Sequence, residues 1–152
     1  MQLTSPEFRS GAFITSRFTC DGENISPKLE FADVPAGARS LVLLMDDPDA
    51  PGGCWTHWVV ADLPATCVGL PEAQPRTQFI CGGSPQGIND FGHLGYGGPC
   101  PPRGKPHRYF FRLYALDAEL AISPGQTKAV VEAALKSHVL AASELIGLYA
   151  RT

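Results

Sequence analysis

The sequence lacks the features that mark several classes of protein. Its 152 residues contain no lysine or arginine cluster longer than two, and the formal net charge is -3. The basic footprint of a nucleic-acid-binding protein is therefore missing, and we expect no nucleic-acid partner. No apolar run approaches the length needed to cross a bilayer, and no basic start precedes an apolar segment. We therefore expect a soluble, cytoplasmic protein without stable membrane insertion.

The cysteines lack the spacing of a zinc site or of a disulfide scaffold. There are five, an odd number, and no two of them form a C-x-x-C pair: Cys20, Cys54, Cys67, Cys81 and Cys100. We therefore expect reduced thiols, and we expect no cofactor. An alternative is that Cys54 and Cys100, which flank two motifs described below, lie close enough together for a redox role.

Proline and glycine, by contrast, are abundant. The 14 prolines and 16 glycines are scattered between short apolar runs. This punctuation is typical of short strands joined by turns. With 44% hydrophobic residues, no internal repeat and no linker, the length suits one domain with a proper core. The sequence predicts a mainly β fold in a single domain over residues 1–152.

Two segments give the clearest strand patterns. The continuous apolar run within residues 40–45 predicts a strand that is covered on both faces. Residues 107–117 alternate strictly, which places one set of side chains on the same face: His107, Tyr109, Phe111, Leu113 and Ala115. Further strands are expected at residues 12–22, 27–35, 57–64 and 77–83.

The remaining segments include a helix, a long loop and an ambiguous tail. Residues 127–136 begin with Thr127 and carry apolar residues at helical spacing, which predicts a capped amphipathic helix. Residues 84–106 are rich in glycine and proline and predict a long loop of the kind that often binds a ligand. In residues 137–151, alanine and glutamate favour helix, whereas Gly147 and the β-branched and aromatic residues disfavour it.

The stretch DDPDAPGGCWTHW, residues 46–58, places acid, imidazole and indole at the end of a predicted strand. Its two prolines fix backbone torsions and make DPDAP a rigid turn. Asp47 in this turn either accepts local hydrogen bonds or serves a ligand. Trp55 and His57 lie two residues apart, so an extended backbone would put them on one face. The alternative is that Trp55 is an aromatic core residue and that His57 is a structural histidine whose hydrogen bonds are satisfied within the protein.

Four ordered blocks of sequence carry a resemblance to a known family. They are DPDAP at 47–51, WTHW at 55–58, YGGPCPP at 96–102 and HRYFF at 107–111. Together with DGENISP near the start and HVLAASELIGLYAR near the end, they resemble the phosphatidylethanolamine-binding protein family. This family is also called Raf kinase inhibitor-like, and its bacterial branch is the most similar. The resemblance spans essentially the whole chain.

The resemblance implies both a fold and a binding pocket. The fold is an antiparallel β-sandwich with Greek-key connections and a helix near the C-terminus, so the ambiguous tail should be extended. The pocket, at one end of the sandwich, holds a small anion such as phosphate, sulfate, acetate or a phospholipid headgroup. Matched position by position, it draws on Asp47, Trp55, His57, His107 and Tyr109, with a rim of Pro51, Gly98, Pro101 and Pro102.

The chemistry of these residues agrees with anion binding. Two imidazoles and a phenol can donate hydrogen bonds to phosphoryl oxygens, and a protonated histidine strengthens the contact. Asp47 cannot donate when it is ionised, so it would orient or charge a histidine or receive an ammonium group of the ligand. We therefore expect a non-enzymatic binding protein for phosphate or a phospho-headgroup such as phosphoethanolamine.

Two other functions stay open. Asp47, His57 and His107 are also the ligand types of many catalytic zinc or iron sites, which would make the protein a metal-dependent enzyme. The pocket could instead be vestigial in a pure protein-interaction module. Since the resemblance includes proteins that restrain kinases or proteases, a regulatory partner of that kind is a further expectation, as is a homodimer.

Overall fold

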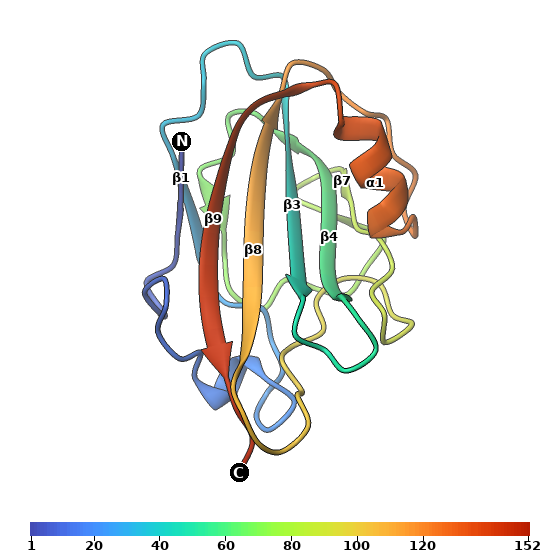
Figure 1. Cartoon of the computed structure of the whole chain (residues 1–152). Helices are drawn as coiled ribbons and strands as arrows, with labels where there is room; N and C mark the ends of the chain where they lie inside the picture. The colour runs from blue at the N-terminus through green and yellow to red at the C-terminus, as the bar shows by residue number, and fades with distance from the viewer.

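A four-stranded antiparallel sheet forms the middle of the structure (Figure 1). The computed structural model describes all of residues 1–152, and the strands of this sheet lie in the order β4-β3-β8-β9. Their bounds are Ser40–Asp47 for β3, Trp55–Pro64 for β4, His107–Leu116 for β8 and Val139–Tyr149 for β9. The strands predicted within residues 40–45, 57–64 and 107–117 are confirmed.

A smaller sheet packs against one face of the large one. Its strands are β1 (Gln2–Thr4), β2 (Leu29–Ala32) and β5 (Gly69–Leu70), and a separate two-stranded sheet pairs β6 (Phe79–Ile80) with β7 (Ser84–Pro85). A cluster of 20 buried residues lies between the layers and joins side chains of both sheets. The structure is thus mainly β, as predicted, and its sandwich core is apolar.

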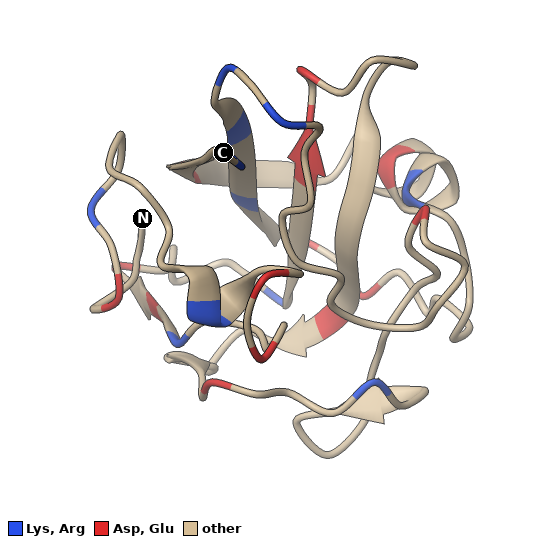
Figure 2. Ribbon diagram, turned by 90° about the horizontal axis from the view of Figure 1, so that it is seen from below, with Lys and Arg blue, Asp and Glu red and all other residues tan.

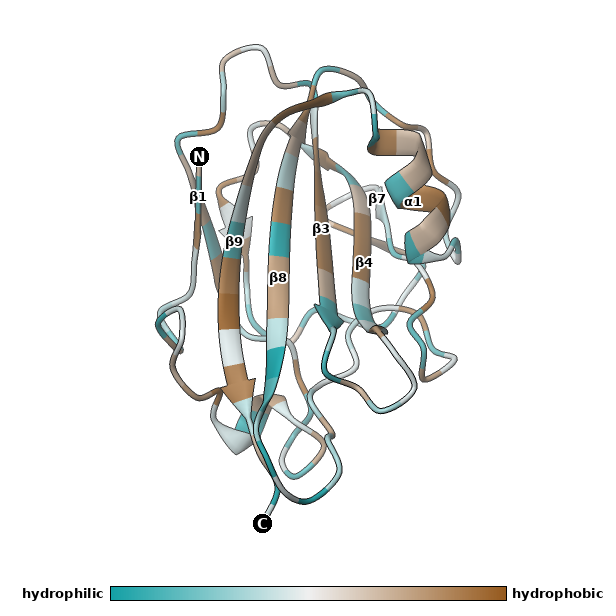
Figure 3. Ribbon diagram, in the orientation of Figure 1, coloured by the Kyte–Doolittle hydropathy of each residue, from teal (hydrophilic) through white to brown (hydrophobic).

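The central strand β3 is covered on both of its faces. Leu41, Leu43 and Met45 belong to the main core, whereas Val42 and Leu44 belong to a second cluster on the opposite face. This alternation explains why β3 reads as a continuous apolar run. Figure 3 shows the consequence: β3 is hydrophobic along most of its length and becomes hydrophilic at its lower end.

The single α-helix packs on the outer face of the large sheet beside β3 and β4 (Figure 1). It spans Lys128–Leu135, and the Oγ1 of Thr127 accepts a hydrogen bond from the backbone N–H of Val130. Val131 and Leu135 are buried in the second cluster. The capped amphipathic helix predicted near the C-terminus is confirmed. No helix in the structure has the length and apolar character needed to span a membrane.

The C-terminal tail forms β9, the longest strand. It pairs antiparallel with β8 along its whole length, from His107 opposite Tyr149 to Leu116 opposite Val139. The intrinsic preferences of the tail residues are ambiguous, so the pairing with β8 decides the conformation. The extended tail that the family resemblance implies is confirmed.

Residues 12–22 do not form the strand that was predicted there. They contain a single bridge between Phe13 and Leu148, followed by a 3-10 helix over Ser16–Phe18. The Thr19 hydroxyl donates to the carbonyl of Ser16, which closes this turn locally. A short side-chain bond of this kind competes with strand pairing, and the apolar pattern alone did not reveal it.

Candidate functional site

Three strand ends meet at one end of the large sheet. β3 ends at Asp47, β4 begins at Trp55 and β8 begins at His107, and because neighbouring strands run antiparallel these residues come together at the lower end in Figure 1. Figure 2 views the molecule from this end and shows Lys and Arg scattered among acidic and neutral residues. The site therefore combines local polarity with no broad basic face.

A pocket of about 170 Å³, here called the inner pocket, opens at this end. It brings together eight of the nine residues that the sequence predicted: Asp47, Pro51, Trp55, His57, Pro101, Pro102, His107 and Tyr109. Sequence reasoning missed three further lining residues, Ala50, Phe91 and Cys100. Two loops, 47–55 and 98–107, thus supply the walls around the strand ends.

A β-bulge interrupts the pairing of β4 with β3 beside the pocket. Met45 of β3 pairs with Trp58 of β4. The next β3 residue, Asp46, pairs with Thr56, so His57 is left as an extra residue without a partner in β3. Bulges of this kind are frequent next to functional sites, because they re-aim one side chain.

The bulge aims His57 into the inner pocket. In a regular strand His57 would share a face with Val59, which packs in the cluster beneath α1. Instead, His57 lines the inner pocket together with Trp55. The two side chains share one wall through simple alternation over residues 55–57, as the sequence suggested, and the bulge determines that this wall is on the pocket side and not on the side of Val59.

His57 is a neutral hydrogen-bond acceptor toward the pocket. Its side chain is buried, and Nδ1 lies 2.5 Å from the carbonyl oxygen of Gly97. A carbonyl oxygen can only accept, so Nδ1 carries the proton. Burial lowers the pKa of His57, although the Gly97 carbonyl acts in the opposite direction. The remaining nitrogen, Nε2, therefore presents a lone pair and not the donor that the sequence analysis expected.

Asp47 orients His107 at the opposite wall. The Oδ2 atom of Asp47 lies 2.7 Å from Nδ1 of His107, and Oδ1 accepts the backbone N–H of Asp49 at 2.8 Å. An ionised carboxylate can only accept, so Nδ1 of His107 donates and Nε2 is the ring nitrogen left for a ligand. Both roles proposed for Asp47 in the sequence, local turn bond and partner of a histidine, are present together.

Tyr109 supplies the floor of the pocket and an unused donor. It is completely buried, and its hydroxyl has no hydrogen-bond partner within the protein. Desolvation, and secondarily the charge of Asp47, raise the pKa of Tyr109, so the phenol keeps its proton. An unpaired buried hydroxyl costs free energy unless a bound group pairs with it. The phenol is therefore a donor near the Asp47 carboxylate that lacks a hydrogen bond of normal geometry, and a bound acceptor can pair with it.

An aromatic pair forms the mouth of the pocket. Trp55 is 38% exposed, and its ring lies edge-on to Phe91 at a centroid distance of 5.5 Å. Phe91 also lies edge-on to His57 at 5.4 Å. Asn89, two residues earlier, is the one sequence feature that points to a fixed position for Phe91. Its Oδ1 accepts the Phe91 N–H and fixes a turn in the long loop.

Gly98 does not line the inner pocket, although it was predicted at the rim. It lines a neighbouring cavity, and its N–H donates to Oδ1 of Asn24 at 2.8 Å. A Cβ at this position would come within 2.4 Å of that same oxygen and of the Phe18 carbonyl oxygen. The glycine is therefore required for close packing of two loops.

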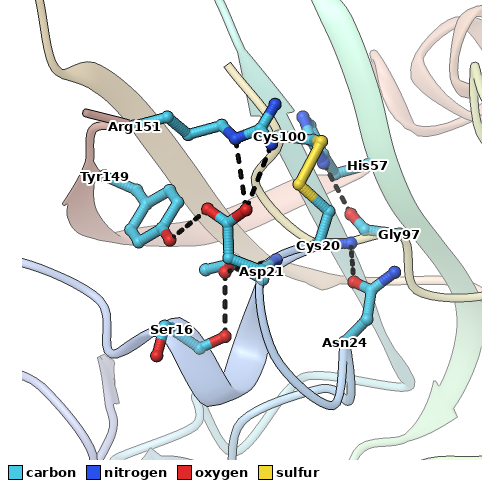
Figure 4. The surroundings of a disulfide bond; sticks show 11 residues. Ser16, Cys20, Asp21, Asn24, His57, Gly97, Cys100, Tyr149 and Arg151 are labelled. Carbon is cyan, nitrogen blue, oxygen red and sulfur yellow. Dashed lines mark hydrogen bonds and ion pairs between the residues drawn. A yellow bond between two sulfur atoms is a disulfide. The ribbon is translucent and has the colours of Figure 1, made fainter. Parts of the chain in front are cut away.

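A disulfide joins Cys20 and Cys100, so the prediction of uniformly reduced thiols is wrong (Figure 4). The two cysteines are 80 residues apart in sequence, which is why their spacing showed no pattern. The other three cysteines are free, and Cys54 lies 3.5 Å from the Lys128 ammonium. Cys100 is therefore bonded to Cys20, and its thiol is not available for the redox role with Cys54 that the sequence left open.

The disulfide ties the pocket rim to the N-terminal loop. Cys100 lines the inner pocket, and the Cys20 N–H donates to the carbonyl of Pro99. The neighbouring Asp21 accepts hydrogen bonds from the Tyr149 hydroxyl and from Arg151, as Figure 4 shows. Covalent and polar links thus hold the rim loop against the end of β9.

The polar residues of the pocket do not form a metal centre. No group of three or more His, Cys, Asp or Glu side chains is placed to hold a metal ion. The Nδ1 atoms of His57 and His107 are both occupied by hydrogen bonds within the protein. The geometry therefore gives no support to the metal-dependent enzyme that the residue types also allowed.

Asp46 lies next to Asp47 in β3 but faces the other side of the sheet. Its carboxylate is buried and accepts hydrogen bonds from Arg112 at 2.8 Å and from Lys128 at 2.9 Å. Lys128 is the first residue of α1, so this group ties the helix to the sheet. The two adjacent aspartates thus have separate tasks.

A β-sandwich with a small polar pocket at one end of its main sheet defines a class of ligand-binding fold. The family model described as Phosphatidylethanolamine-binding protein matches residues 4–150. A UPF0098 protein of Methanothermobacter thermautotrophicus is 53% identical over 151 residues, and the match covers 99% of each chain. One from Aquifex aeolicus is 49% identical over 153 residues, covering 99% of this chain and 89% of the relative. The chain belongs to the phosphatidylethanolamine-binding protein family.

Two solved structures are similar to this chain over nearly its full length. A phosphatidylethanolamine-binding protein homologue from Chlamydia trachomatis has a TM-score of 0.91 and 41% identity, covering 99% of this chain and 97% of that chain. YbcL from E. coli, described as a new member of the mammalian family, has a TM-score of 0.91 and 37% identity, covering 99% and 98%. The fold class and the bacterial type that the sequence motifs predicted are confirmed.

Proposed function

We propose that the inner pocket binds a phosphate or phospho-headgroup without chemical change of the ligand. The observation that carries this proposal is the buried hydroxyl of the pocket residue Tyr109, which makes no hydrogen bond of normal geometry in the protein. A phosphoryl oxygen supplies the missing acceptor. At about 170 Å³, the inner pocket has room for a group of this size but not for a whole lipid.

The two histidines give the bound group complementary contacts. His107, held through Nδ1 by Asp47, can donate from Nε2 to a phosphoryl oxygen when its ring is protonated. His57, protonated on Nδ1, offers Nε2 as an acceptor. A phosphate that keeps one P–OH group satisfies both, so the proposed ligand is a monoprotonated phosphate or phosphomonoester.

The lining residues also support binding without catalysis. No serine or threonine lines the inner pocket, and its one cysteine, Cys100, is held in a disulfide. Covalent catalysis through a serine, threonine or cysteine therefore has no nucleophile at this position. The polar groups present serve to hold an oxyanion in a fixed orientation.

Replacing Tyr109 by phenylalanine tests the proposal. Tyr109→Phe should lower phosphate affinity by roughly tenfold or more, because a hydrogen bond to a charged group contributes about 1.5 to 3 kcal/mol. The unfolding free energy of the ligand-free protein should stay equal or rise, because no bond within the protein is lost. Proton-nitrogen NMR titration with phosphate and phosphoethanolamine gives the affinities, and urea unfolding gives the stability.

Tyr114→Phe is the matched control, because Tyr114 lies on the same strand but faces the α1 side of the sheet. Its phosphate affinity should equal that of the wild type. Saturable shifts at residues 47 to 57 and 98 to 109 are expected for the wild type. If phosphate moves no resonance there, or if Tyr109→Phe binds as well as the wild type, the proposed function is wrong.

A further inference from the structure

A second cavity, here called the outer cavity, adjoins the inner pocket. Its volume is about 550 Å³, and Phe91 and Cys100 line both spaces. Sites for organic ligands usually measure about 300 to 1,000 Å³, so the inner pocket alone is too small for such a ligand. An organic ligand anchored in the inner pocket has room for its remaining part in the outer cavity.

Arg76 is the only lysine or arginine among the residues that line the outer cavity, and no aspartate or glutamate lines it. Arg76 donates from Nε to the Tyr96 carbonyl at 2.7 Å and from Nη2 to the Asn24 carbonyl at 2.5 Å. A guanidinium has five N–H donors, so three remain, and no carboxylate neutralises the charge.

The core of the protein holds Arg76 in place. The buried side chain of Gln86 donates to the carbonyls of Pro75 and Thr77, the residues on either side of Arg76. Gln86 in turn accepts a hydrogen bond from the indole N–H of buried Trp58. The loop that carries Arg76 is therefore fixed before any ligand arrives, which reduces the entropy lost on binding.

We propose that the outer cavity receives a second acidic group of the ligand, bound by Arg76, while the first occupies the inner pocket. The ligand class is then a small organic phosphate with a carboxylate or second phosphate at its other end. This inference rests on the proposed function, because the inner pocket must anchor the first group. An oxyanion is the natural partner of a preorganised guanidinium that has free donors.

A series of ω-phosphonocarboxylic acids of increasing chain length tests the inference. Each member is compared by titration calorimetry with the alkylphosphonate of equal length, which lacks the carboxylate. At one or more chain lengths that bridge the two spaces, the wild type should bind the phosphonocarboxylic acid (the diacid) at least about tenfold more tightly than the alkylphosphonate of equal length. Comparison with the alkylphosphonates removes the affinity that the alkyl chain of the ligand gains from apolar contact with Phe91.

The variant Arg76→Gln should abolish this preference and leave the affinity for methylphosphonate within about twofold of the wild type. Arg76→Lys should restore part of the preference, because it keeps the charge but not the planar fork. The chain-length series is measured on the wild-type protein, so its result does not depend on whether the variants fold. The bound diacid should shift the Arg76 side-chain N–H and the His93 resonances, whereas methylphosphonate should not.

Three results would overturn the inference. The first is a diacid series without any preference at any length. The second is a preference that Arg76→Gln retains. The third is a failure of methylphosphonate itself to shift residues 47 to 57 or 107 to 109, which would sink the proposed function as well, whereas the first two leave that function intact.

Discussion

His57 carries its proton on Nδ1, because the Gly97 carbonyl can only accept, and burial favours its neutral form. A neutral imidazole in this orientation leaves Nε2 as a hydrogen-bond acceptor, so under the proposed function it favours a ligand that carries a proton to donate. His107 differs, because the carboxylate of Asp47 stands beside it. Residue type alone makes the two histidines equivalent, whereas their partners differ, because a backbone carbonyl holds His57 and a carboxylate holds His107.

The lowered pKa of His57 makes the stability of the protein depend on pH. The unfolded imidazole has the ordinary pKa of 6.5, and the folded one binds a proton less readily. Stability should therefore be complete above pH 6.5 and decrease as the pH falls below that value toward the folded pKa. Urea unfolding of the wild type and of His57→Gln at several pH values checks this.

His57→Gln keeps an N–H that can reach the Gly97 carbonyl but does not titrate. The difference in unfolding free energy between wild type and variant should therefore shrink as the pH falls. A difference that stays constant from pH 7.5 to 5.5 would contradict the assignment of a buried, neutral His57. Other titrating groups act equally on both proteins, so they cancel in this comparison.

Strand β3 shows how one element serves two structures at once. Its alternation sends Met45 and then Asp47 to the core and pocket side, and Leu44 and then Asp46 to the helix side. Two adjacent carboxylates are thereby buried without facing each other. Asp47 belongs to the binding pocket, whereas Asp46 anchors α1 through Lys128 and pairs with Arg112.

Asp46→Asn should lower the unfolding free energy by about 2 kcal/mol, because two partly buried cations lose their shared counter-charge. Its phosphate affinity should stay within about twofold of the wild type. Asp47→Asn is the matched variant, and it should weaken phosphate binding because His107 loses the carboxylate that holds it. Equal effects of both variants on affinity would argue against the division of labour between the two faces.

Across the whole molecule, the disulfide is the one covalent cross-link between distant parts of the sequence. It joins the loop that follows the 3-10 helix to the rim of the inner pocket, 80 residues later in the sequence. A cross-link over a long loop stabilises mainly by restricting the unfolded chain. The same bond also holds the wall that the inner pocket shares with the outer cavity.

Thiol titration checks the disulfide directly. Denatured protein should show three reactive thiols before reduction and five after it, since Cys54, Cys67 and Cys81 are free. Replacing Cys20 and Cys100 together by serine should lower stability by about 2 to 4 kcal/mol. The control Cys54→Ser should change stability by less than about 0.5 kcal/mol. Five thiols in unreduced protein would refute the cross-link.

The mainly β architecture and the helix could be predicted from local sequence patterns, and most of the pocket residues from the family resemblance. Strand β8 could be predicted because its alternation is regular, and α1 because Thr127 caps a helical apolar pattern. The strand and helix patterns depend on neighbouring residues, whose local geometry the sequence encodes directly. Asp47, His107 and Tyr109 could be found because they lie in short ordered motifs that resemble those of the family, and the resemblance implies their place in the pocket.

Tertiary structure alone decided the features that depend on distant contacts. The bulge at His57 exists through pairing with β3, the disulfide through a fold that brings Cys20 to Cys100, and the tail conformation through β8. No local pattern specifies such contacts, because each depends on which surfaces the folded core brings together. The unpaired charge of Arg76 also depends on distant contacts. Only the folded chain shows that the guanidinium donates to two backbone carbonyls and to no carboxylate.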